Sequence, residues 1–223
     1  MLHKKERLTQ AFEVFLVLLL AFGLPIYSST LHALNPPLQT EINDKGILEL
    51  LAFELLVTGI ILLIFKSRGI QLKQFPWSFQ WNMIWIGLGL VVLRLLIGEF
   101  GNWLWAQTPF AIPNNTTFTL SASLLPLALL IVFNSIYEEF FLLGYLHFRM
   151  HRLGIVTFIA LSSLIRFSYH TYQGWASAPM LLTMGILFSI YYFKTQKLWP
   201  PILAHAMGNT FLFLNMQYNW INL

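Results

Sequence analysis

Five polar residues in the second half of the chain lie in or beside apolar stretches. Glu138 and Glu139 are adjacent and follow the run LLPLALLIVF, His170 comes later, and His205 and Asn209 are four residues apart. That last spacing puts two side chains on one helix face. A carboxylate can take a proton from water, and imidazole can orient that water or bind a metal that holds it. An amide and a second imidazole can stabilise an oxyanion, so the set is suited to hydrolysis.

Each of these residues also has a purely structural interpretation. A histidine or an asparagine in a membrane helix is more often a helix–helix hydrogen bond than a catalyst. Two adjacent carboxylates are harder to explain, because an ionisable group at membrane depth costs about 3 kcal/mol on insertion scales. Adjacent side chains on a helix point about 100° apart, which predicts that Glu138 and Glu139 do not face the same partner.

The composition indicates that a membrane protein carries these residues. Of the 223 residues 57% are hydrophobic and 10% are charged, whereas soluble domains carry about 25% charged residues. Continuous apolar runs of bilayer-spanning length favour helices over barrel strands. The predicted fold class is therefore all-α, a polytopic bundle of about seven transmembrane helices. The predicted helices are 8–27, 47–65, 81–97, 124–146, 154–169, 178–193 and 199–214.

The loops predict the orientation of this bundle. Basic residues precede the first stretch and follow the second, fourth and sixth, whereas the opposite loops hold only Lys45, offset by Glu41 and Asp44. This bias predicts a cytoplasmic N-terminus and an outer C-terminus. We expect an integral protein of the bacterial plasma membrane. The net charge of +4 is spread along the chain, which indicates attraction to a lipid bilayer and no nucleic-acid binding. The absence of cysteine excludes disulfides and thiolate metal sites.

Three motifs in order carry a family resemblance. Glu138-Glu139-Phe-Phe-Leu-Leu-Gly-Tyr-Leu, His170-Thr-Tyr-Gln-Gly and His205-Ala-Met-Gly-Asn209 resemble the CAAX protease and bacteriocin-processing family, also called CPBP or Abi. The resemblance covers about residues 124–214. We therefore expect N-terminal transmembrane helices without a recognised motif in 1–116 and a CPBP-like catalytic core in 117–223.

The resemblance implies a glutamate-dependent intramembrane endopeptidase that cuts peptide or protein substrates at the membrane. By this likeness Glu138 and His170 activate the attacking water, His205 and Asn209 form the oxyanion site, and Glu139 supports them. The family is often described as metalloproteases. A divalent metal such as zinc would then have Glu138, His170 and His205 as its ligands, although the motifs also suit a metal-free general-base mechanism.

Two departures from the family pattern belong together. The family's usual arginine after the glutamate pair is replaced by Leu143, and its usual phenylalanine before the first histidine is replaced by Arg166. An unpaired buried charge would be strongly destabilising, by about 3–5 kcal/mol. We therefore expect Arg166 to pair with Glu139 from the neighbouring helix, in place of an arginine at position 143. The alternative is that Arg166 snorkels or binds a substrate carboxylate.

Other placements follow from the same spans. Alternation puts His205 and His170 toward opposite sides of the membrane, so both reach Glu138 only if the fifth helix is short, tilted or preceded by a re-entrant stretch. We expect a water-filled cavity that opens to the cytoplasmic side. The polar residues of the second and third helices are expected to pair across helices; they are Glu49, Glu54, Arg94 and Glu99.

Two other function classes remain open. A non-catalytic bacteriocin-immunity or scaffold protein could keep the site residues as a polar bundle core, and Leu143 favours it while Arg166 argues against it. A small transporter could use Glu138 and His170 as a proton relay. The sequence contains no inverted repeat, which weighs against the transporter.

Overall fold

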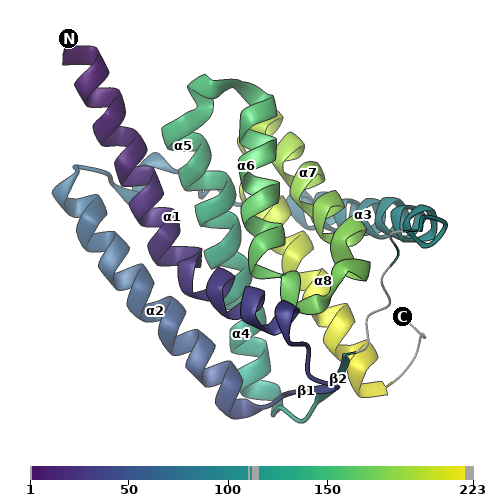
Figure 1. The fold of residues 1–223 in the computed structure, drawn as a ribbon. Coiled ribbons are helices and arrows are strands. Elements are labelled where there is room, and N and C mark those ends of the chain that lie inside the picture. Colours follow the sequence, from purple (N-terminus) through teal and green to yellow (C-terminus); the bar gives the residue numbers. More distant parts are fainter. Residues whose placement is uncertain (1, 110, 112–115, 219–223) are drawn as a thin grey trace.

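The computed structural model describes residues 2–109, 111 and 116–218, and they form a bundle of long helices (Figure 1). The prediction of an all-helical fold is confirmed. The α-helices are α1 (Leu2–Leu34), α2 (Asp44–Ser67), α3 (Asn82–Ala106), α4 (Leu124–Glu139), α5 (Leu146–Met150), α6 (Gly154–Tyr169), α7 (Ala178–Thr195) and α8 (Trp199–Tyr218). A π-helical segment, Phe140–Tyr145, joins α4 to α5. Short 3₁₀ turns are Leu72–Gln74, His151–Leu153, Thr171–Gln173 and Trp175–Ser177, and two strands are β1 (Gln39–Ile42) and β2 (Thr117–Leu120).

All seven predicted stretches are helical, and several helices extend beyond them. Within the described ranges, 5 stretches are long and apolar enough to cross a membrane, and one of them is the joined stretch Leu124–Tyr169. The prediction of a membrane-embedded helical bundle therefore agrees with the structure. The number of seven crossings stays a prediction.

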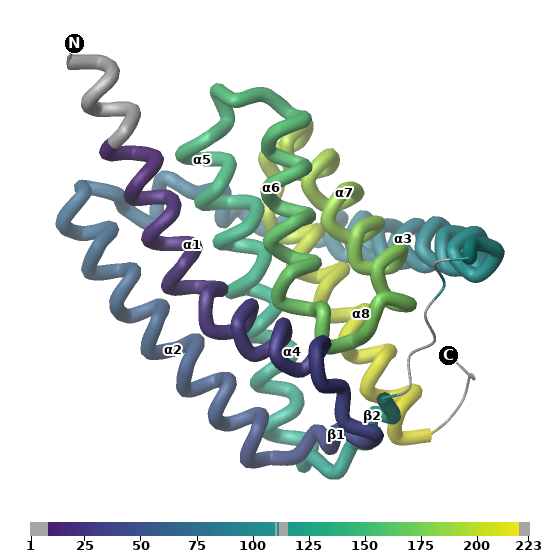
Figure 2. Tube along the Cα trace, in the orientation of Figure 1, coloured from purple at the N-terminus to yellow at the C-terminus, as the bar shows by residue number. Residues whose placement is uncertain are grey.

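The helices surround a core built largely from the second half of the chain. In Figures 1 and 2, α1 and α2 run along one side of the bundle, α4 and α6 lie next to them, and α7 and α8 lie beyond. Helix α1 packs on α6, α2 packs on α4, and α3 packs against α7 and α8. Aromatic contacts join the two halves of the chain; in one of them Phe22 stacks on Tyr169 with ring centroids 5.0 Å apart.

Close helix contacts depend on small residues. At Gly185 in α7, an added Cβ would lie 2.8 Å from the Cα of Ser163 in α6. At Gly98 in α3, an added Cβ would lie 2.4 Å from the sulfur of Met180. Small residues allow membrane helices to approach closely and to gain van der Waals contact where no hydrophobic effect drives them together.

The two strands form a parallel pair that the sequence did not predict. Gln39 pairs with Thr117 and Ile42 with Leu120. Beside this pair, the side chain of Asp44 at the start of α2 accepts hydrogen bonds of 2.6 Å from the backbone N–H and the hydroxyl of Ser123. The starts of α2 and α4 are therefore tied together at the same end of the bundle.

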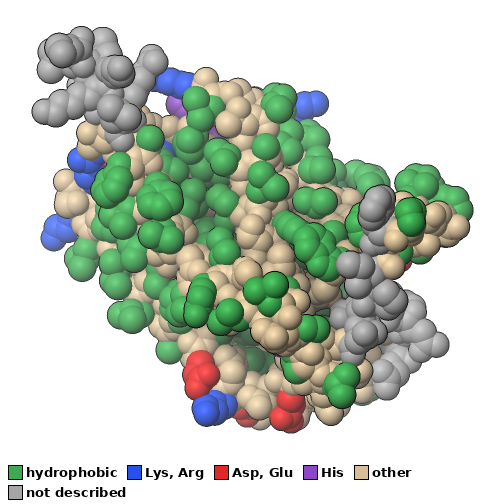
Figure 3. Space-filling model, viewed as in Figure 1, with side chains coloured by type: hydrophobic (Ala, Val, Ile, Leu, Met, Phe, Trp, Pro, Cys, Tyr) green, Lys and Arg blue, Asp and Glu red, His purple; other side chains and the backbone are tan. Residues whose placement is uncertain are grey.

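The surface has an apolar belt with charged groups toward its ends. Large exposed side chains cover the outer faces of α1, α2 and α3, among them Phe12, Phe15, Leu55, Leu56, Leu63, Trp85 and Leu96. Figure 3 shows blue basic side chains toward the upper end of the face in view and red acidic side chains gathered at the lower end. Lys45 and Glu49, near the start of α2, form an exposed pair at 3.9 Å.

Candidate functional site

The site forms where α4, α6 and α8 meet inside the bundle. Glu138 and Glu139 are the last residues of α4, Arg166 is in the last turn of α6, and His205 is in α8. All four are buried, and Glu139 and Arg166 are 0% exposed. Charged groups this deep need partners, and here they are one another's partners.

The local backbone changes directly after the glutamate pair. Residues Phe140–Tyr145 form a π-helix, whose turn is wider than that of an α-helix, and all of them are buried. Such segments are often found at functional sites. Leu143, at the position of the family's usual arginine, lies in this segment and is 0% exposed. It therefore leaves the charge of the carboxylates to be balanced from another helix.

Arg166 supplies that balance. Its Nη2 lies 2.7 Å from Oε2 of Glu139, and its Nη1 lies 3.3 Å from Oε2 of Glu138. The predicted Glu139–Arg166 pair is confirmed. The expectation that the two carboxylates face different partners is wrong, because the guanidinium is a planar fork whose two nitrogens reach both of them.

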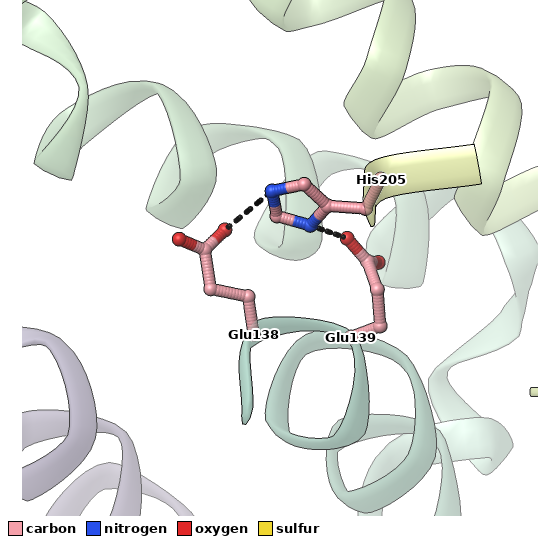
Figure 4. Close-up of side chains that lie close together, drawn as sticks. All are labelled: Glu138, Glu139 and His205. Carbon is pink, nitrogen blue, oxygen red and sulfur yellow. Dashed lines mark hydrogen bonds and ion pairs between the residues drawn. The ribbon is translucent and has the colours of Figure 1, made fainter. Parts of the chain in front are cut away.

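His205 lies between the two glutamates (Figure 4). Its Nδ1 is 2.8 Å from Oε1 of Glu139, and its Nε2 is 4.0 Å from Oε2 of Glu138. A carboxylate that accepts from one ring nitrogen fixes the tautomer and the orientation of the ring. The free Nε2 of His205 is thereby directed toward Glu138.

Glu138 has three further neighbours. Its Oε2 accepts a short hydrogen bond from the hydroxyl of Tyr169, and its Oε1 accepts from Nδ2 of Asn134 at 3.1 Å. Nε2 of His170 lies 3.9 Å from Oε2. Sequence reasoning missed Tyr169 and Asn134. Asn134 could have been found from its position one helical turn before Glu138.

His170 follows the end of α6. The sequence put His170 and His205 toward opposite sides of the membrane, and the short α6 explains how both can lie near Glu138. Helix α6 has only 16 residues, about 24 Å at 1.5 Å per residue, which is shorter than a hydrocarbon core of about 30 Å. The chain then turns through Thr171–Gln173. Burial lowers the pKa of His170, although Glu138 opposes that effect. The ring is therefore mainly neutral at pH 7 and can accept a proton.

A cavity of about 840 Å³ extends from these residues. Glu138, His170, His205 and Asn209 line it together, so four of the predicted site residues share one space. Leu130, Asn134 and Tyr137 of α4 and the turn after α6 also line it. The far part of its wall comes from α1, β1, α2, β2 and α8, with Ser28, His32, Thr40, Gly46, Phe118 and Met216 among the residues. These lie at the end of the bundle that carries β1 and β2. The part of this cavity lined by described residues therefore extends away from the basic loops, whereas we expected it to open on their side.

The expected pairing between polar groups of α2 and α3 is wrong. Glu54 accepts a hydrogen bond of 2.7 Å from Nδ2 of Asn134 in α4, and Glu49 pairs with Lys45 in its own helix. Among the described residues Arg94 has no ion pair, and its Nε is buried without a hydrogen-bond partner. Asn134 therefore binds the carboxyl of Glu54, which was expected to pair with a charged residue of α3.

The site offers carboxylate oxygens and imidazole nitrogens, which are common metal ligands. However, the contacts that these atoms already make fit a metal ion poorly. Glu138, Glu139 and His205 each place one ligand atom within 4.8 Å of the others. However, Oε2 of Glu138 already accepts from Tyr169 and lies beside Arg166. Both oxygens of Glu139 are occupied by His205 and Arg166. A divalent cation would have to displace these bonds and sit near a guanidinium charge, which opposes its binding.

Comparisons with known proteins agree with the motifs. The model of one family, described as type II CAAX prenyl endopeptidase Rce1-like, matches residues 120–211. No curated protein and no solved structure matches the chain. The matched range contains Glu138, Glu139, Arg166, His170, His205 and Asn209. The model that matches residues 120–211 is therefore that of the CPBP family, the same family that the three motifs resemble.

Proposed function

We propose that this protein is an intramembrane endopeptidase that hydrolyses peptide bonds of membrane-associated substrates with a water molecule activated by Glu138. One observation carries the proposal. The Nε2 atoms of His170 and His205 lie 3.9 and 4.0 Å from the same Oε2 of Glu138, at the wall of the cavity. Such spacing is too long for a direct hydrogen bond and suits a bridging water.

In the proposed mechanism, Glu138 takes a proton from that water as it attacks the peptide carbonyl carbon. The neutral ring of His170 orients the same water. As the carbonyl oxygen becomes negative, the side chain of Asn209 donates a hydrogen bond to it. His205 donates a second one through Nε2–H in its protonated form, while its Nδ1–H stays on Glu139. Each donor contributes about 3–4 kcal/mol. The proton on Glu138 then passes to the leaving nitrogen as the carbon–nitrogen bond breaks.

The remaining charged groups support these steps. Glu139 orients His205 through the 2.8 Å contact and stabilises the ring when it takes up a proton. Arg166 balances the two carboxylates from α6. No step requires a metal, so peptidase activity should survive a chelator, and loss of activity that added zinc restores would contradict a metal-free mechanism.

The division of the chain and its orientation are parts of the proposal. Residues 117–223 form the catalytic core, and helices in 1–116 supply one wall of the cavity. The basic loops support an N-terminus in the bacterial cytoplasm. Because the cavity extends away from those loops, the substrate enters from the outer side of the plasma membrane. A leader-type or secreted peptide fits this route better than a prenylated cytoplasmic protein.

A non-catalytic immunity or scaffold role is the alternative. Leu143 favoured it, because loss of the family's arginine could leave the carboxylates unbalanced. The pairing of both carboxylates with Arg166 removes that objection. A polar core without catalytic work would also have no need for a cavity of about 840 Å³ beside Glu138.

The test is cleavage by purified protein in detergent, with a mixed panel of prenylated and leader-type peptides. Glu138→Ala and His170→Ala should abolish cleavage while both variants remain folded. Glu99→Gln is the control, because Glu99 is exposed on α3 and does not line the cavity. If the wild type cleaves nothing, or the two alanine variants cleave as fast as wild type, the proposal fails and the scaffold role replaces it.

A further inference from the structure

A third carboxyl group, Glu54, lies in the cavity wall and has no part in the mechanism above. It belongs to α2, is 2% exposed and lines the cavity with Glu138. Its Oε1 accepts a hydrogen bond of 2.7 Å from Nδ2 of Asn134. Its Oε2 is buried and has no hydrogen-bond partner.

The surroundings of Glu54 do not support a negative charge. Among the residues that the structure describes, no lysine, arginine or histidine forms an ion pair with Glu54. The other carboxyl on the same Asn134 nitrogen is Glu138, at 3.1 Å, and it already carries the negative charge that Arg166 balances. An ionised carboxylate buried without a partner is far more costly than a neutral acid that is hydrogen-bonded. Glu54 is therefore an uncharged carboxylic acid.

A neutral carboxylic acid has one acceptor oxygen and one O–H donor. Since Oε1 accepts from Asn134, the proton is on Oε2, the atom without a partner. A buried donor without an acceptor is rare and calls for an explanation. The wall of a substrate cavity provides one, because a ligand that enters can supply the acceptor.

We propose that Glu54 is a substrate-binding residue whose Oε2–H donates a hydrogen bond to a backbone carbonyl of the peptide in the cavity. The proposal rests on the peptidase function above and names the group that this site recognises, an extended peptide backbone. Glu54 and Glu138 share one asparagine nitrogen. An extended chain advances about 3.3 Å per residue, so a carbonyl one or two residues from the cleaved bond can reach Glu54.

The first test reads the proton directly and does not depend on activity. Infrared difference spectra of wild type against Glu54→Gln at pH 7 should contain the carbonyl-stretch band of a protonated carboxyl group. The same comparison for Glu99→Gln, at a glutamate that does not line the cavity, shows which bands a Glu→Gln substitution elsewhere in the protein produces. If the wild-type minus Glu54→Gln spectrum contains carboxylate bands and no protonated band, the proposal is overturned, whatever the peptidase assays give.

The second test measures binding of fluorescent prenylated and leader-type peptides to the cleavage-deficient Glu138→Ala protein. Adding Glu54→Leu should weaken binding about three- to tenfold, the range expected for one neutral hydrogen bond. Adding Glu54→Gln, which restores a donor and an acceptor, should recover most of that loss, and Glu99→Leu should change nothing. Equal affinities of the leucine and glutamine variants would overturn the proposal. Absence of cleavage by wild type with the infrared band present would instead refute the peptidase function alone.

Discussion

Replacing Arg166 by methionine should destabilise the protein more than most single substitutions. The change removes the 2.7 Å contact with Glu139 and the 3.3 Å contact with Glu138 and leaves the side chain of Glu139, which is 0% exposed, without a cation. Breaking a buried pair on one side costs about 3–5 kcal/mol. For a chain of this length each kcal/mol lowers Tm by about 2–4 °C, so we expect a loss of about 6–20 °C.

Thermal unfolding in detergent, followed by tryptophan fluorescence, measures this loss. Arg152→Met is the matched control, because Arg152 is exposed in the turn before α6, and its Tm should stay within about 2 °C of wild type. The double variant Glu139→Gln/Arg166→Met should be more stable than Arg166→Met, since it removes the unpaired charge as well. A Tm for Arg166→Met equal to that of the control would refute the reasoning.

The same measurement tests whether the arginine has moved within the fold. Arg166→Phe combined with Leu143→Arg restores the family's usual pattern at both positions. If Arg166 replaces the missing arginine, the double variant should recover a large part of the Tm lost in Arg166→Phe alone. If Leu143→Arg adds its own destabilisation and recovers nothing, the two positions are independent.

Two further substitutions test the site and its support. Tyr169→Phe removes the hydroxyl bound to Glu138 and should lower Tm by about 3–12 °C, because a hydrogen bond to a charged group contributes about 1.5–3 kcal/mol; an unchanged Tm would exclude this role. Gly185→Ala should lower Tm, since the new Cβ would lie 2.8 Å from the Cα of Ser163, whereas Gly59→Ala, with nothing within 4 Å, should not. Equal Tm values for the two alanine variants would contradict the close packing of α6 on α7.

The fold was predictable because each helix is a continuous apolar run. Predicted ends were short where a helix continues past its apolar stretch: α1 extends to Leu34 and α3 to Ala106. The pairing of β1 with β2 could not be predicted. Each strand has only 4 residues, and their association depends on where helices far apart in the sequence end.

Residue type and depth revealed the charged part of the site, and the departure at position 143 led to Arg166. Asn134 was within reach of the same reasoning, since it shares a helix face with Glu138. Glu54 was not, because its hydrogen bond to Asn134 exists only through the packing of α2 on α4. Spacing along one helix can be read from a sequence, whereas the partner of a side chain across two helices depends on how they are rotated.

Much of the cavity wall comes from α1 and α2, which affects how the substrate preference of such a protein can change during evolution. The proposed hydrolytic residues lie within the matched range 120–211, whereas α1 and α2, which lie outside that range, supply a large share of the lining, including Pro25, Leu50, Phe53 and Glu54. Substitutions in these two helices can alter the shape and polarity that a substrate meets without touching the residues that perform chemistry. If the proposed function holds, substitutions in α1 and α2 can change the substrate preference while the proposed catalytic residues stay the same, and exchanging α1 and α2 between homologues is a rational route to new specificity.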